Sequence, residues 1–112
     1  MYFNEHYADR LCKDHPDYQA FWLKHYHLGP DGKVLLVKLP NEMWWNVDGR
    51  ASNCDKKDDN EHACWVRHGE APNITVDKQG LTCGAGAGSI DSTHGTYGNW
   101  HGFLQNGVLV KC

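Results

Sequence analysis

Turn-forming residues divide the chain from residue 29 onward into short apolar runs. Gly-Pro-Asp-Gly stands at 29–32, and Asp48-Gly49 and Asn106-Gly107 follow it. Glycine, proline and asparagine supply the backbone angles that tight turns need. Asn106-Gly107 separates NWHGFLQ (99–105) from VLVK (108–111), which is the strongest hairpin signal in the chain. Runs this short, bounded by turns, predict β-strands.

Four more runs predict strands for the same reason, and a polar loop, ASNCDKKDDNE, lies at 51–61. These runs are KVLLVKL (33–39), MWWNV (43–47), HACWVRH (62–68) and NITVD (73–77).

The first 28 residues instead predict helix in two pieces. Asn4 caps a first helix that runs through Lys13, and Asp14 caps a second that has Pro16 in its first turn. Aromatic residues in the second piece recur at spacings of three and four and form one stripe: Tyr18, Phe21, Trp22 and Tyr26. The sequence therefore predicts an α+β fold in which this helical segment packs on a small antiparallel sheet.

The length of 112 residues predicts a single domain, with a helical segment over 1–28 and a β-rich part over 33–112. The net charge of −3 argues against nucleic acid as a partner. No apolar run is long enough to span a bilayer, and MYFNEHYADR does not read as a signal peptide, so we expect no membrane insertion and no secretion by a signal peptide. In a reducing cytosol the five cysteines would stay as thiols.

The segment LTCGAGAGSI (81–90) alternates glycine with alanine. It lacks the third glycine of a dinucleotide fingerprint and the lysine of a P-loop, so phosphate binding is disfavoured. Glycines on one strand face would let an aromatic ring lie against the backbone. We expect that ring to be Trp65 or Trp100.

Cysteines and histidines gather in the same half of the chain and predict a zinc site. The preferred ligands are Cys54, Cys64, Cys83 and His101, with His62 as a substitute. The spacing C-x7-H-x-C contains no standard zinc knuckle, and the alternative is that Cys64 and Cys83 are small buried apolar residues.

A catalytic arrangement of Cys83 with His94 or His101, oriented by Asp91, is a second possibility. The alternative is that residues 91–94 form a solvated loop, which their composition favours. No specific catalytic signature is present, so we expect a protein that is not an enzyme.

The second half of the chain resembles a group of small uncharacterised proteins encoded by bacteriophages, chiefly those of actinobacteria. The resemblance covers about residues 43–110 and includes WWNVDG, HACWVRHGEAPNITVDKQGLTCGAGAGSI and WHGFLQNGVLV. Matching positions are Trp45, Asp48, Gly49, Pro72, Ile74, His101, Phe103, Asn106 and Gly107. Trp100 stands where many members of the wider family carry cysteine, and the C-x-C-G cluster of some members is missing.

The resemblance implies a phage origin, and with it a place in the host cytoplasm or the virion. We expect a non-enzymatic accessory protein that binds another protein, either a phage structural protein or a host defence protein that it inhibits. Trp44, Trp45 and Trp100 are the expected contact residues, although strand alternation leaves only one of the first two free. The alternative is a small metal-dependent hydrolase that acts on a nucleotide or peptide through Cys83, His94 and His101.

Overall fold

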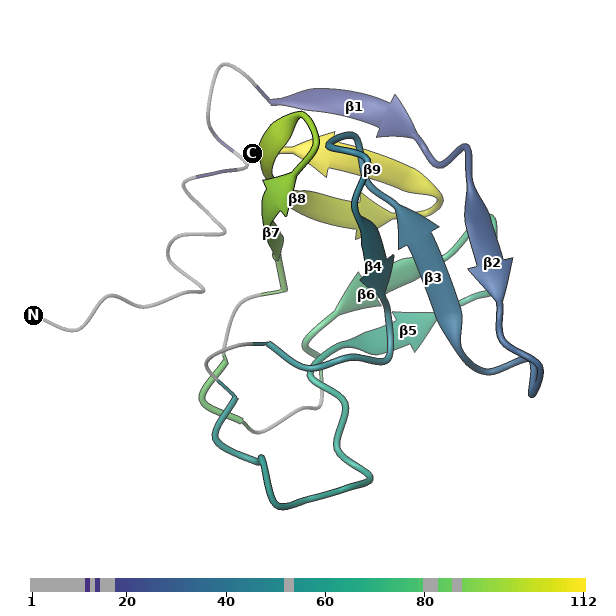
Figure 1. Ribbon diagram of the computed structural model, residues 1–112, viewed down its shortest axis with the longest axis vertical. Helices are drawn as coiled ribbons and strands as arrows, with labels where there is room; N and C mark the ends of the chain where they lie inside the picture. The colour runs from purple at the N-terminus through teal and green to yellow at the C-terminus, as the bar shows by residue number, and fades with distance from the viewer. Residues whose placement is uncertain (1–11, 13, 15–17, 52–53, 80–82, 86–87) are drawn as a thin grey trace, which may run out of the picture.

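The computed structural model describes residues 12, 14, 18–51, 54–79, 83–85 and 88–112, without the side chains of residues 94 and 95. Cys12 is helical, and every element that the structure describes from residue 18 onward is a β-strand (Figure 1). The strands are β1 (Gln19–Trp22), β2 (Tyr26–Leu28), β3 (Leu35–Lys38), β4 (Trp44–Asn46), β5 (Val66–His68), β6 (Thr75–Asp77), β7 (Ile90–Gly95), β8 (Gly98–Gln105) and β9 (Val108–Lys111).

The strands form three antiparallel sheets. The largest has the order β1-β9-β8-β7, the second has the order β2-β3-β4, and the third is the pair β5-β6. Consecutive strands β1 and β2 therefore belong to different sheets, and each lies at the edge of its own (Figure 1).

The predicted α+β fold is wrong, because residues 19–22 and 26–28 form strands where a helix was expected. Phe21 lies opposite Leu109 on β9, and His27 lies opposite Leu36 on β3. A spacing of four, as between Tyr18 and Trp22, fits one face of a strand as well as one face of a helix. Pairing with β9 and β3 decided between them, and aromatic residues suit strands. Most of the predicted first helix, from Asn4 through Lys13, lies outside the described residues.

The apolar core draws on all three sheets. Its most deeply buried side chains include Leu35, Val37, Val76, Ile90, Leu104 and Leu109. Leu35 and Val37 alternate with less buried residues along β3, as expected for a strand with one face on a core. β7 occupies residues 91–94, where a solvated loop had been the alternative expectation.

The hairpin between β8 and β9 confirms the prediction made from Asn106-Gly107. Both residues have positive φ, 50° and 77°, and Leu104 lies opposite Leu109. The Gly107 N–H donates to the Ile74 carbonyl at 2.9 Å, and its carbonyl accepts from Leu23 N–H at 2.9 Å. The hairpin tip thereby connects the segment after β1 to the segment before β6.

The glycine-rich segment contacts one of the two expected tryptophans. Trp65 Nε1 donates to the Gly88 carbonyl at 3.1 Å, and Ala85 is buried. Gly86 lies outside the described residues. The ring of Trp100 packs on a different glycine, because a Cβ at Gly102 would lie 2.7 Å from it. Among the described residues, no helix has the length and apolar character needed to cross a membrane.

Candidate metal centre

Two loops bring three cysteines and one histidine together below the sheets. Cys54, His62 and Cys64 come from the long loop between β4 and β5, and Cys83 comes from the segment before β7. The two segments lie side by side at the lower end of the molecule in Figure 1. Their three sulfur atoms and one imidazole nitrogen all lie within 4.8 Å of one another, so the group could hold a metal ion.

The loop that carries three of these residues is held by its own polar contacts. Arg50 donates to the carbonyl of Lys56 at 2.6 Å and also to the carbonyl of Asp59. Asp55 accepts a hydrogen bond from Gly84 N–H at 2.7 Å. Because Asp55 follows Cys54 and Gly84 follows Cys83, this bond fixes the distance between the two loops.

The sulfur atoms differ in their surroundings. Cys54 and Cys64 are buried and Cys83 is half-buried. Burial raises the pKa of the Cys64 thiol to about 11. Burial acts in the same direction on Cys83, but the hydrogen bond from Lys78 Nζ, at 3.1 Å, helps lower the pKa of this thiol overall. Cys83 is therefore more easily ionised than Cys64.

The histidine of this group is His62, whereas His101 was the preferred ligand and His62 its substitute. His62 Nε2 lies 3.7 Å from Cys64 Sγ. HACWVRH (62–68) was expected to be a strand throughout, but His62 and Cys64 both precede β5. The loop itself, and not strand alternation, brings the two side chains to the same side.

His101 lies instead beside a disulfide between Cys12 and Cys112. Its Nδ1 is 3.9 Å from Cys12 Sγ. The disulfide corrects the expectation that all five cysteines stay reduced. This pair leaves no signal in the sequence, because the two cysteines are 100 residues apart and neither belongs to a recognisable motif.

The residues of the possible catalytic arrangement are divided between the two groups. Cys83 lies with Cys54, His62 and Cys64, whereas His101 lies with Cys12 and Cys112. Asp91 is the direct strand partner of His101. The side chain of His94 lies outside the described part.

The three tryptophans expected at a partner surface have different environments. Trp44 is 42% exposed, and its ring lies 4.7 Å from that of His27. Trp45 turns to the other face of β4 and packs edge-on against Trp65, with ring centroids 5.1 Å apart. Trp100 is only 4% exposed and belongs to the core. Trp44 is therefore exposed, Trp45 is partly buried and Trp100 is buried.

The residues that hold the site together gave little signal in the sequence. Arg50, Asp55 and Lys78 are ordinary charged residues of polar segments, and their roles depend on contacts between loops. Comparison with protein-family models, curated proteins and solved structures found no match to this chain.

Proposed function

We propose that this protein is a small β-domain stabilised by a structural zinc ion, and that it acts without catalysis by binding another protein. The observation that carries the zinc assignment is the convergence of Cys54, His62, Cys64 and Cys83 within 4.8 Å. Three thiolates and one imidazole form a standard ligand set of structural zinc.

The geometry supports zinc over a harder cation. With zinc–sulfur bonds of about 2.3 Å and zinc–nitrogen bonds of about 2.0 Å, a tetrahedral site places sulfur and nitrogen ligands about 3.5 Å apart. The 3.7 Å between His62 Nε2 and Cys64 Sγ is close to that value. Soft thiolates disfavour magnesium and calcium, which prefer oxygen.

Metal analysis and cobalt substitution test this assignment. Protein purified without chelators should contain about one zinc per chain, and the cobalt form should show the absorption of tetrahedral thiolate ligation. His62→Ala should lower zinc affinity and His101→Ala should leave it unchanged, because only His62 belongs to the four-residue group.

Two kinds of result would contradict the zinc assignment. Equal zinc loss in both variants, or zinc loss in His101→Ala alone, contradicts the ligand set. A chain that is folded and metal-free would make the three cysteines ordinary buried residues.

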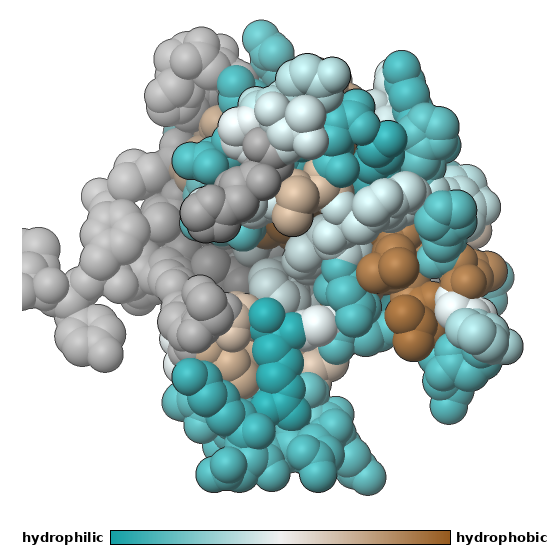
Figure 2. Space-filling model, in the orientation of Figure 1, coloured by the Kyte–Doolittle hydropathy of each residue, from teal (hydrophilic) through white to brown (hydrophobic). Residues whose placement is uncertain are grey.

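The protein-binding role is supported by exposed aromatic and aliphatic side chains on β1, β2 and β4. Trp22 is 72% exposed, Leu28 is 58% exposed and Trp44 is 42% exposed. Figure 2 shows a hydrophobic area on the side of the molecule where β2 and β3 lie. Large exposed aromatic residues are common at the centres of protein interfaces.

The resemblance to phage-encoded proteins over about residues 43–110 supports a partner from the virion or from host defence, and a role as an accessory protein in the host cytoplasm or virion. A metal-dependent hydrolase receives less support. Four protein ligands occupy all four coordination positions of a tetrahedral zinc ion and leave none for the water that such an enzyme activates.

Site-specific photo-crosslinking tests the binding role. A benzoylphenylalanine introduced at Trp22 or Trp44 should give a discrete protein adduct in the cells that make the chain. The same probe at Lys57, an exposed residue of the polar loop, serves as the control. Adducts at neither tryptophan, or the same adducts at Lys57, contradict a specific partner surface.

A further inference from the structure

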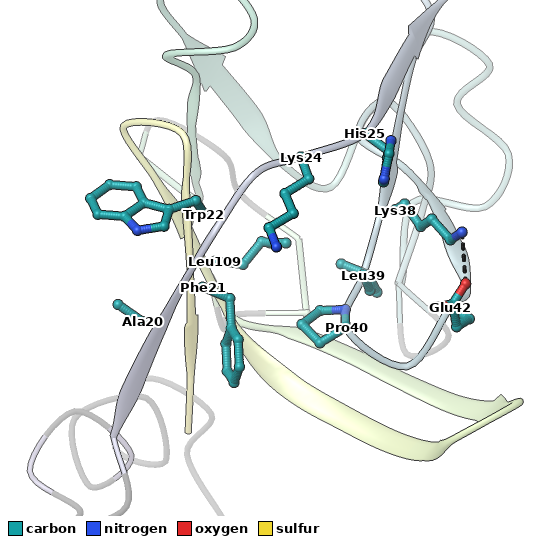
Figure 3. A pocket seen from close by; sticks show the side chains of 10 residues that line it. All are labelled: Ala20, Phe21, Trp22, Lys24, His25, Lys38, Leu39, Pro40, Glu42 and Leu109. Atoms are coloured by element: carbon teal, nitrogen blue, oxygen red, sulfur yellow. Dashed lines mark ion pairs between the residues drawn. The ribbon is translucent and has the colours of Figure 1, made fainter.

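A cavity of about 480 Å³ lies between β1 and the turn that joins β3 to β4. Phe21 and Pro40 stand on opposite sides of it, and Leu39 and Leu109 also line it (Figure 3). Leu39 and Leu109 are 3% and 2% exposed, so the apolar interior of the cavity continues into the core. A volume of this size, in the range of about 300–1,000 Å³ of ligand sites, accommodates a large apolar side chain.

The charged residues of the cavity favour an acidic occupant. Lys38 is paired with Glu42 at 2.6 Å, which neutralises both charges. Lys24 has no hydrogen-bond or ion-pair partner among the described residues, and Figure 3 shows its side chain extending towards the cavity. Among the described residues that line this cavity, Glu42 is the one acidic residue. The unbalanced charge at its edge is therefore positive.

A second hollow continues the same surface towards the outer face of the β2-β3-β4 sheet. It shares Lys24, His25 and Lys38 with the first and adds Trp44 and His27, and none of its described lining residues is acidic. The two hollows thus form one surface of positive and aromatic side chains that is longer than a single inserted side chain. An occupant with several residues in a row fits this surface better than a single small molecule.

The strands beside the cavity are suited to an extended segment. In the described part, β1 pairs with β9 alone and β2 pairs with β3 alone. The outer backbone groups of both strands are therefore not used by the sheets, and free edges of this kind accept an additional strand.

We propose that this groove, from Phe21 to Trp44, binds an extended acidic segment of a partner protein that inserts one large apolar side chain between Phe21 and Pro40. This inference rests on the proposed protein-binding function and names the chemistry of the partner. Lys24 supplies the charge contact, and Leu39 and Leu109 form the floor under the inserted side chain.

Fluorescence anisotropy with three labelled peptides tests the inference. The probes are SGEEFLEEGS, its basic counterpart SGKKFLKKGS, and SGEEAAEEGS, which lacks the apolar pair. The first should bind measurably, and the other two should bind at least about tenfold more weakly, because each lacks one of the two contacts. Binding of the first should also weaken as salt is raised.

A matched pair of charge reversals locates the contact. Lys24→Glu should weaken binding of the acidic peptide about tenfold or more, whereas Lys33→Glu, an exposed lysine outside both hollows, should change it little. Phe21→Ala should weaken binding by removing one wall. Thermal unfolding of each variant checks that the fold is retained.

Three results overturn the inference. They are equal binding of the acidic and basic peptides, equal effects of the two charge reversals, and a dimer that forms in place of peptide binding. If photo-crosslinks form at Trp22 or Trp44 while the peptides fail, the protein-binding function stands and only this assignment of the groove is lost.

Discussion

The thiol of Cys83 differs from that of Cys64 in both exposure and ionisation. Cys64 is fully buried and its pKa is raised to about 11, mainly by burial. Cys83 is half-buried, and the nearby Lys78 ammonium group helps to bring its pKa below the ordinary value. The thiolate is the reactive form of cysteine, so the two residues should react at different rates.

In protein treated with a chelator, iodoacetamide at pH 7 should modify Cys83 before Cys64. Lys78→Met should slow the reaction of Cys83, because removal of the ammonium group raises the thiol pKa and lowers the thiolate fraction. The difference in Cys83 reactivity between Lys78→Met and the unsubstituted chain should shrink above about pH 9, where an ordinary thiol is also ionised. Mass spectrometry of labelled peptides measures the rates, with Lys57→Met as the control. A Lys78→Met protein that reacts as fast as the unsubstituted chain at pH 7 would contradict the charge effect.

Asn41 is a buried polar residue that joins two parts of the fold. Its Nδ2 donates to the Gly98 carbonyl at 3.0 Å and to Ser92 Oγ at 3.2 Å, and its Oδ1 accepts from Met43 N–H. These bonds connect the β3–β4 turn to the β7–β8 hairpin. The amide is needed because a donor and an acceptor must act from the same side chain.

Asn41→Asp should lower the free energy of unfolding by about 1–3 kcal/mol, since a carboxylate has the same shape but leaves the Gly98 carbonyl without a donor. Urea unfolding measures the change. Asn60→Asp, at an exposed site in the polar loop, should have little effect. Similar losses in the two variants would mean that the contacts of Asn41 do not contribute.

At the scale of elements, the β8–β9 turn reverses the chain and also packs against the segment before β6. Gly107 and Gly32 have nearly the same positive φ, 77° and 72°. A Cβ at Gly107 would lie 2.2 Å from the Pro72 carbonyl oxygen, whereas a Cβ at Gly32 would meet nothing within 4 Å. Substitutions at these two glycines can therefore separate the cost of backbone strain from the cost of steric overlap.

Gly32→Ala should destabilise the protein by about 1–2 kcal/mol through its φ angle alone. Gly107→Ala should lose about 1–3 kcal/mol more, because the added methyl group forces the hairpin tip away from the segment before β6. Thermal and urea unfolding of the two variants give the difference. Equal losses would show that the hairpin tip is not packed as described.

For the whole molecule, the Cys12–Cys112 disulfide closes nearly the entire chain. The two residues are 100 positions apart, and Cys112 N–H also donates to the His101 carbonyl at 2.8 Å. A cross-link over so long a loop removes much of the conformational freedom of the unfolded state.

Replacing both Cys12 and Cys112 by Ser should lower the free energy of unfolding by about 2–4 kcal/mol. Zinc content should be unchanged, because neither residue belongs to the proposed zinc ligands, which are Cys54, His62, Cys64 and Cys83. Urea unfolding with and without reductant provides the measurement, and reductant should have no further effect on the double variant. Loss of zinc in that variant would show that the two groups depend on each other.

The amino-acid sequence by itself determined the local features. Asn106-Gly107 specified its turn because few other residue pairs adopt positive φ at both positions. The ends of VLVK coincide with β9, and the predicted strand over KVLLVKL contains β3. The residue types Cys54, His62, Cys64 and Cys83 also indicated metal-binding chemistry before their positions were known.

Tertiary structure decided everything that depends on partners distant in the chain. Whether residues 19–28 became helix or strand was settled by β9 and β3, since an aromatic spacing of four suits both conformations. The choice of His62 over His101, and the pairing of Cys12 with Cys112, followed from which loops meet in space. Local sequence cannot specify such meetings, because they depend on how the three sheets pack around one core.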